Sequence, residues 1–279
     1  MKILIATPAY GSVVYSAYHD SVLRTVSFFA ANFPGIAFES RILSLSMVTT
    51  ARNLLASLVL NDESFTHLLF IDADMGFQPS LIARMLAFRK PVTGIVAPQR
   101  RLDYEAYHKA RARTDQPALA RVIGNEYVAG DGAVLVDRMS DGTSRIEVVD
   151  GFVRATHTGT GIMLIERGVL EQMRDAFPEL WVAEPPEHVR RLGLAEGGLL
   201  QCFEPGRDKK GIALGEDVTF CLRWTQRLEG EIWANIDEPI MHVGQETHTG
   251  HFLTRLQHGP IRLDIVQRDA APGDEPADA

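Results

Sequence analysis

The chain has 279 residues, with 28 Lys and Arg against 36 Asp and Glu, a formal net charge of −8. Hydrophobic residues make up 46% and charged residues 23%, ordinary values for a folded protein, so disorder of the whole chain is excluded. The acidic balance argues against a broad electrostatic surface for nucleic acid or anionic lipid, and no nucleic-acid partner is expected. Two cysteines, Cys202 and Cys221, are too few for a disulfide framework or a four-thiolate zinc site and are predicted to be reduced and buried.

The first hundred residues alternate between apolar runs and segments with helical periodicity. Strands are predicted at 2–6, 36–43, 67–71 and 92–96, and helices at 16–32, 46–60 and 79–88. The apolar stripe of the first helix is predicted to consist of Val22, Leu23, Val26 and Phe29. This alternation predicts the α/β class, with a mostly parallel, Rossmann-like sheet flanked by helices.

The pattern changes near residue 100. Residues 100–116 are polar and basic, which predicts a loop or a lone surface helix and makes the segment a candidate lid. Residues 119–154 are rich in Val and Ile and broken by Asp-Gly pairs, which are typical of hairpin turns. We therefore expect a loop and an antiparallel β insertion over about 100–157, within one domain spanning 1–267.

The last part returns to strands and helices. Strands are predicted at 160–165, 199–203 and 230–236, and helices at 168–177, 216–228 and 248–257. Residues 268–279 are acidic, contain Pro and Gly and lack large apolar side chains, so they are predicted to be a disordered tail. No run of about 18 apolar residues and no secretion signal is present, and a soluble, cytoplasmic protein is expected.

The strongest chemical motif is Asp72-Ala73-Asp74, directly after the predicted strand 67–71. Open α/β sheets bind ligands at the carboxyl ends of their strands. Two carboxylates one residue apart can face one hard cation, which takes oxygen ligands and often keeps substrate phosphates. The alternative is that both aspartates solvate a loop or cap the next helix.

Two further motifs carry acidic or imidazole groups. Glu216 and Asp217 open a predicted helix, where the dipole favours acidic residues, or where one carboxylate accepts a proton from a substrate hydroxyl. His242 follows the last predicted strand and is either a ligand for the same cation or a surface or core histidine.

Arg52 lies near the start of the second predicted helix, where it either pairs with phosphate oxygens or is a surface arginine. Thr7, Pro8 and Tyr10 follow the first strand, where a base or ribose could stack, or where the chain simply turns.

A resemblance to a known family is carried by six segments, which are, in chain order, TPAYG, TTARN, FIDADMGF, GTGIMLI, GEDVTFCLRW, and EIW with HVG. Together they resemble glycosyltransferases of the GT-A fold. The likeness is greatest to bacterial, family-2-like members with a D-x-D motif, with some likeness to fungal mannosyltransferases of cell-wall mannan. It covers about residues 1–250, is strongest at 70–77 and 215–224, and is weakest at 100–154.

The resemblance implies a UDP- or GDP-sugar donor, Mn²⁺ or Mg²⁺, and a saccharide or glycolipid acceptor, in cell-surface polysaccharide or lipopolysaccharide synthesis. It leaves peripheral association with the inner membrane face open. By this resemblance the metal ligands are Asp72, Asp74 and His242; the donor-nucleotide residues are Thr7, Pro8, Ala9, Tyr10, Arg52, Asp72 and Ala73; the catalytic residues are Asp217 and Glu216; and the acceptor-side residues are Gly159, Thr160, Gly161 and Trp224.

The sequence thus predicts a metal-dependent glycosyltransferase, in which Asp217 is the base if the reaction inverts the anomeric centre and an acceptor ligand if it retains it. One alternative is a nucleotidyltransferase acting on sugar phosphates, although the loop TPAYGSVVYS has one Gly and no Lys or Arg. The other is a non-catalytic carbohydrate-binding protein on a transferase fold. The donor sugar, the acceptor and the oligomeric state are left open by the sequence.

Overall fold

The chain divides into two units, Met1–Gly244 and Gln245–Ala279. The computed structural model describes residues 1–128, 133–138, 144–194 and 196–244, which all belong to the first unit. The helix expected at 248–257, the tail expected at 268–279 and the Asp-Gly pairs at 131–132 and 141–142 lie outside the described residues.

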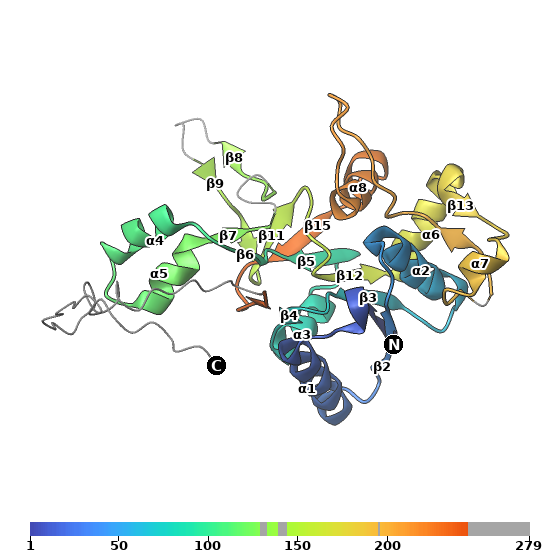
Figure 1. Ribbon diagram of the computed structural model, residues 1–279, viewed down its shortest axis with the longest axis horizontal. Helices are drawn as coiled ribbons and strands as arrows, with labels where there is room; N and C mark the ends of the chain where they lie inside the picture. The colour runs from blue at the N-terminus through green and yellow to red at the C-terminus, as the bar shows by residue number, and fades with distance from the viewer. Residues whose placement is uncertain (129–132, 139–143, 195, 245–279) are drawn as a thin grey trace, which may run out of the picture. The chain divides into compact units, whose positions relative to one another are not determined.

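The first unit is built on an eight-stranded sheet with the strand order β10-β11-β15-β5-β12-β3-β1-β2 (Figure 1). Its strands are β1 (Lys2–Pro8), β2 (Ala37–Leu43), β3 (His67–Ile71), β5 (Val92–Ile95), β10 (Val148–Val149), β11 (Phe152–Ala155), β12 (Ile162–Glu166) and β15 (Ile232–Asn235). Strands β11 and β12 are antiparallel to both of their neighbours, so the other six strands share one direction. The predicted α/β class with a mostly parallel sheet is confirmed.

Helices and short two-stranded sheets complete the described part of the unit. The helices are α1 (Ser16–Asn32), α2 (Val48–Asn61), α3 (Pro79–Phe88), α4 (Tyr104–Arg111), α5 (Pro117–Gly124), α6 (Arg167–Ala176), α7 (Glu187–Arg190) and α8 (Glu216–Leu222), with single turns at η1 (Tyr10–Ser12), η3 (Pro178–Leu180) and η4 (Arg223–Arg227). The short strand pairs are β4 (Met75–Gly76) with β16 (Met241–His242), β6 (Pro98–Leu102) with β7 (Asn125–Tyr127), β8 (Asp137–Arg138) with β9 (Ser144–Arg145), and β13 (Trp181–Val182) with β14 (Leu199–Leu200). No helix in the described part of the chain combines the length and the apolar character needed to cross a membrane.

The core has two layers, one on each face of the sheet. Along β1 and β3, side chains such as Ile5 and Ile71 pack with α1 and α3, whereas Leu4 and Phe70 pack with α2, α6 and α8 (Figure 1). Because successive side chains of a strand point to opposite faces, a strand covered on both sides must be apolar throughout. This explains the uninterrupted apolar runs that mark β1 and β3 in the sequence.

The predicted apolar stripe of α1 is partly wrong. Leu23 and Val26 are exposed, whereas Ser21 and Thr25 are buried. The hydroxyl of Ser21 accepts a hydrogen bond from the backbone N–H of Phe77 at 2.9 Å. Both hydroxyls also donate hydrogen bonds to the backbone of their own helix. These small polar side chains let α1 lie close to the segment after β3, and hydrophobic periodicity alone does not reveal such a buried polar face.

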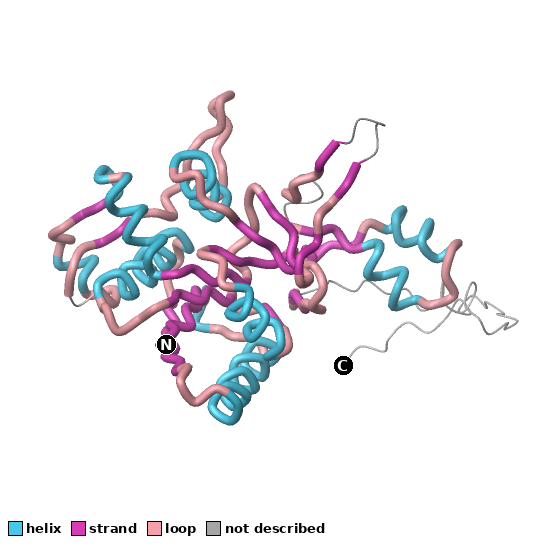
Figure 2. Tube along the Cα trace, turned by 180° about the vertical axis from the view of Figure 1, so that it is seen from behind, coloured by secondary structure: helices cyan, strands magenta, loops and turns pink. Residues whose placement is uncertain are grey.

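The segment 100–157 is more helical than predicted. Helices α4 and α5 pack against each other (Figure 2), and α4 is capped by the preceding residue, Asp103, whose carboxylate accepts backbone hydrogen bonds from the first turn. The helix α5 was not expected, although Pro117 stands at a position that favours a helix start. The antiparallel character is confirmed by the β6–β7, β8–β9 and β10–β11 pairs. The pair Asp150-Gly151 forms the β10–β11 turn with φ of 51° and 83°, as the Asp-Gly signal predicts.

Candidate functional site

The candidate site lies where β3 ends and β12 begins. Because the two strands are antiparallel, with Ile71 opposite Ile162, the residues after β3 lie beside those before β12. The backbone N–H of Asp72 donates to the carbonyl oxygen of Gly161 at 2.8 Å. The strand order therefore brings together the Asp72–Asp74 motif and Gly159–Gly161, which are far apart in the sequence.

The short sheet β4–β16 adds His242 to this edge. His242 lies opposite Met75, and the N–H of Val243 donates to the carbonyl oxygen of Asp74 at 2.8 Å. The Nδ1 atom of His242 lies 2.8 Å from the carbonyl oxygen of Pro98, so it must carry the proton of that hydrogen bond. The other nitrogen, Nε2, lies 3.5 Å from Oδ2 of Asp74.

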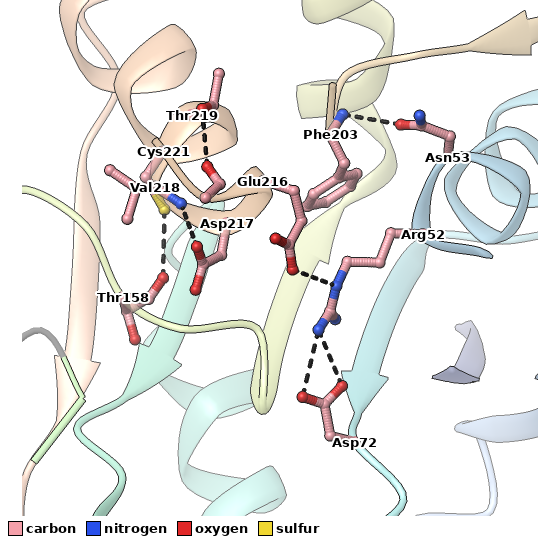
Figure 3. Close-up of polar contacts among 11 residues, drawn as sticks. Arg52, Asn53, Asp72, Thr158, Phe203, Glu216, Asp217, Val218, Thr219 and Cys221 are labelled. Atoms are coloured by element: carbon pink, nitrogen blue, oxygen red, sulfur yellow. Dashed lines mark hydrogen bonds and ion pairs between the residues drawn. The ribbon is translucent and has the colours of Figure 1, made fainter. Parts of the chain in front are cut away.

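A buried arginine joins three elements of the site. The side chain of Arg52 on α2 is 5% exposed, and its Nη2 lies 3.2 Å and 3.3 Å from the two carboxylate oxygens of Asp72 (Figure 3). Its Nε donates to Oε1 of Glu216, the first residue of α8, at 3.2 Å. The next residue of α2 is Asn53, whose side chain accepts a hydrogen bond from the backbone N–H of Phe203 at 2.9 Å. This bond holds the segment that leads toward α8. Arg52 thereby fixes the ends of β3 and α8 relative to α2.

Asp217 is the carboxylate of this group that pairs with no cation in the described part of the chain. Figure 3 shows it turned away from Arg52, and its Oδ1 accepts a hydrogen bond from the N–H of Val218 at 2.7 Å. Burial raises the pKa of Asp217, and the neighbouring charge of Glu216 adds to the shift. A Cβ at Gly159 would lie 3.7 Å from Oδ2, so the absence of a side chain there keeps the space before that oxygen open.

A cavity of about 120 Å³ connects these groups. The predicted site residues that line it come from five segments of the chain, and they are Arg52, Asp72, Gly159, Thr160, Gly161, Asp217 and His242. It is completed by apolar side chains from Met75, Ile95, Ala97 and Val128. Asp74 and Glu216 contact lining residues through the ion pairs described above.

Other predicted residues do not line this cavity, namely Thr7, Pro8, Ala9, Tyr10, Ala73 and Trp224. Thr7 is fully buried and its hydroxyl lies 2.6 Å from a tyrosine hydroxyl on α1. Tyr10 is 81% exposed in η1, and Trp224 is buried in the core, where its indole N–H donates to a backbone carbonyl. The carbonyl oxygen of Ala73 accepts a backbone hydrogen bond at the start of α1. The roles expected for these residues stay predictions.

The metal expectation can be compared with the donor atoms present. The described residues contain no group of three or more His, Cys, Asp or Glu side chains placed to hold a metal ion. Asp72 is turned to Arg52, but Asp74 and His242 form a pair. With Nδ1 bonded to Pro98, Nε2 of His242 faces Oδ2 of Asp74, and either a proton on Nε2 or a cation between the two atoms satisfies this pair. A carboxylate and an imidazole fit a divalent ion whose remaining ligands are phosphate oxygens and water.

The two groups of this pair shift each other's pKa. Burial favours the neutral form of Asp74, but His242 and the Arg100 guanidinium outweigh it, and the pKa of Asp74 is lowered. The hydrogen bond to Asp74 raises the pKa of His242. The Asp74 carboxylate is therefore ionised and surrounded by positive charge.

The pKa of Asp72 is raised, because burial of the carboxyl outweighs the charge of Arg52. Nη1 of Arg52 is buried without a hydrogen-bond partner among the described residues, and so is Oδ1 of Asp72, whose 3.2 Å contact with Nη2 is an ion pair and not a hydrogen bond. A donor and an acceptor are thus left over beside the cavity.

Sequence reasoning missed one charged residue, Arg100, which was noted only as part of a basic stretch. Its Nη1 lies 3.3 Å from Oδ2 of Asp74. The sequence does not show that β6 runs beside β16. The two segments are about 140 residues apart, and no local pattern encodes a contact between them. The apolar lining residues Met75 and Val128 likewise gave no signal beyond their hydrophobicity.

No family model matches the sequence, and no curated protein matches it. Among solved structures, the crystal structure of A197 from STIV is similar over 88% of this chain and 87% of that chain, at 14% identity and a TM-score of 0.42. A putative glucose-1-phosphate thymidylyltransferase from Bacillus anthracis, solved in complex with a sucrose, is similar over 86% of this chain and 88% of that chain, at 12% identity and a TM-score of 0.34. Neither likeness is close enough to bear on function, which depends here on the side chains of the site.

Proposed function

We propose that the protein transfers a glycosyl group from a nucleoside-diphosphate sugar to a hydroxyl acceptor, with Mn²⁺ or Mg²⁺ as cofactor. The observation that carries this proposal is the arrangement around one cavity. His242, which is paired with Asp74, lines this cavity together with the unpaired carboxylate of Asp217 and with Arg52, which joins Asp72 to Glu216. The substrate classes are a UDP- or GDP-sugar and a saccharide or glycolipid acceptor.

The charge of the site supports a divalent cofactor. Four carboxylates, those of Asp72, Asp74, Glu216 and Asp217, stand against two guanidinium groups, those of Arg52 and Arg100. Each of these carboxylates that is ionised repels a diphosphate, which is itself an anion. A divalent ion removes this repulsion, and a bound ion would also stabilise the negative charge of the departing nucleoside diphosphate.

Asp74 and His242 would hold the ion, with Asp72 beside them. Magnesium prefers oxygen ligands, whereas an imidazole ligand suits a first-row transition ion. We therefore expect Mn²⁺ to support binding and turnover better than Mg²⁺.

Asp217 has the chemistry expected of a general base. Burial raises the pKa of Asp217, which makes its carboxylate more basic than that of an ordinary aspartate. In an inverting transfer the acceptor oxygen bonds to the anomeric carbon, the bond from that carbon to the diphosphate breaks, and the acceptor proton passes to Asp217. In a retaining transfer Asp217 would bind the acceptor hydroxyl. Glu216 acts through Arg52, because its carboxylate is already paired.

The experiment is a panel of UDP- and GDP-sugars with Mn²⁺, in which release of the nucleoside diphosphate is measured. Asp217→Asn should lower turnover by about 10²- to 10⁴-fold, the usual contribution of a general base. Asp175→Asn, on an exposed aspartate of α6, is the matched control and should leave turnover unchanged. Unchanged turnover in Asp217→Asn would contradict the role of this residue.

Two other outcomes would contradict the proposed reaction itself. Release of pyrophosphate from a nucleoside triphosphate and a sugar phosphate would identify nucleotidyl transfer. Saccharide binding without turnover of any nucleotide sugar would identify a non-catalytic carbohydrate-binding protein.

A further inference from the structure

Arg100 extends from β6 over the Asp74–His242 pair. Its Nη1 lies 3.3 Å from Oδ2 of Asp74, the same oxygen that His242 Nε2 approaches to 3.5 Å. The stem of the arginine passes over Gly244, where a Cβ would lie 2.5 Å from Cδ of Arg100. The absence of a side chain at Gly244 is therefore what lets Arg100 lie along this path.

The guanidinium and a divalent ion compete for one oxygen. An ion bound to Oδ2 of Asp74 would leave Arg100 within a few ångströms of a second, larger positive charge, which is unfavourable unless an anion lies between them. The diphosphate of the proposed donor is such an anion, and a guanidinium binds phosphate oxygens with two parallel hydrogen bonds.

Arg100 is free to make this change without moving its strand. Its side chain is 52% exposed, so rotation meets solvent on one side. The backbone of β6 is held separately, because the carbonyl oxygen of Pro98 accepts the hydrogen bond from His242. The imidazole therefore keeps its orientation while the arginine side chain moves.

We propose that Arg100 holds the cation position beside Asp74 in the unloaded protein and transfers to the phosphate oxygens of the nucleotide when the divalent ion binds. This inference rests on the proposed function. It makes binding of ion and nucleotide interdependent, since the arginine opposes the ion alone and stabilises the ion together with the diphosphate. Arg100 is then a nucleotide-binding residue that also prevents the site from taking up a divalent ion without its substrate.

The test uses the full chain with Arg100→Ala, Arg100→Lys and the control Arg101→Ala. Arg101 is the next residue of β6, is 76% exposed and pairs with Glu126. Mn²⁺ affinity is measured by electron paramagnetic resonance without nucleotide, and UDP and GDP affinity by calorimetry at saturating Mn²⁺.

Arg100→Ala is expected to bind Mn²⁺ alone about fivefold more tightly, a value typical of the coupling between two ligands. It is expected to bind the preferred nucleotide about tenfold more weakly, a value typical of the loss of a charged contact to phosphate. Arg100→Lys keeps the charge but not the paired donors, so its Mn²⁺ affinity should stay near that of the unaltered protein while its nucleotide affinity falls by a smaller factor. Arg101→Ala should change neither affinity.

Affinities that fall together in Arg100→Ala, or that both stay unchanged, would overturn the inference, because a structural role alone cannot shift them in opposite directions. Asp74→Asn separates this failure from that of the proposed function. If Asp74→Asn abolishes Mn²⁺-dependent nucleotide binding while Arg100→Ala shows no opposed shift, only the role of Arg100 is wrong. If Asp74→Asn leaves that binding intact, or if the unaltered protein binds neither UDP nor GDP with Mn²⁺, both proposals are wrong.

Discussion

Replacing Arg52 with methionine should destabilise the protein strongly, because the guanidinium neutralises two carboxylates away from solvent. The Arg52 side chain is 5% exposed, and those of Asp72 and Glu216 are 30% and 20% exposed. Breaking a buried ion pair by removing one partner costs about 3–5 kcal/mol, since the other charge stays without compensation. Because both carboxylates keep some contact with water, we expect the lower end, about 3 kcal/mol.

The free energy of unfolding would be measured in urea at pH 7 and at pH 5. Burial raises the pKa of Asp72, and removing Arg52 takes away the charge that opposes this shift, so the folded variant binds a proton more readily and its deficit should shrink as the pH falls. Adding Glu216→Gln to Arg52→Met removes one uncompensated charge and should recover part of the loss. Arg41→Met is the control, because Arg41 is 60% exposed and a surface pair contributes about 1 kcal/mol or less. A loss in Arg52→Met no larger than that of the control, or one independent of pH, would refute the reasoning.

Three other changes test separate features. Burial raises the pKa of Asp217 in the folded state, so its ionisation opposes folding above the pKa of an unfolded aspartate. Asp217→Asn should therefore raise the thermal midpoint of unfolding at pH 7 but not near pH 3. An unchanged midpoint at pH 7 would argue against burial of this carboxyl group. At Gly94 on β5 a Cβ would lie 2.4 Å from a buried threonine side chain, so Gly94→Ala should cost about 1–3 kcal/mol in urea unfolding, whereas Gly35→Ala, with nothing within 4 Å, should cost almost nothing. Burial raises the pKa of the Cys202 and Cys221 thiols to about 12, so neither should react with a thiol reagent at pH 8 until the chain unfolds; rapid labelling of the folded protein would contradict this.

The strands and helices of the first hundred residues could be predicted because their signals are local. The spans 16–32, 67–71 and 79–88 match α1, β3 and α3. Each has a clear start or stop, such as Pro79 at the beginning of α3. Burial of β3 on both faces makes its whole length apolar, and this reveals the strand without knowledge of its neighbours.

The helix that begins at Glu216 was predicted as one span to residue 228, but α8 ends at Leu222 and the chain continues as the wider turn η4. The side chain of Trp224 is buried beneath this turn, and its N–H donates to the carbonyl oxygen of Glu231 on the segment that leads into β15. Periodicity along the sequence does not distinguish an α-helix from a wider turn.

The site was predictable as a set of residues more than as a set of contacts. The position of Asp72 after a buried strand identified the edge of the sheet, because that inference needs only the strand direction. Two contacts of the site depend on the strand order, which the sequence did not reveal. One joins Arg52 to Glu216, 164 residues later, and the other joins Arg100 to Asp74.

The most direct test of the account is a crystal structure of the protein soaked with Mn²⁺ and UDP or GDP, recorded so that the anomalous scattering of manganese locates the ion. The account predicts one manganese peak between Oδ2 of Asp74 and Nε2 of His242, in contact with the diphosphate, and Arg100 turned from Asp74 to a phosphate oxygen. Manganese or diphosphate bound elsewhere, with the ion pairs of Asp74 unchanged, would contradict it.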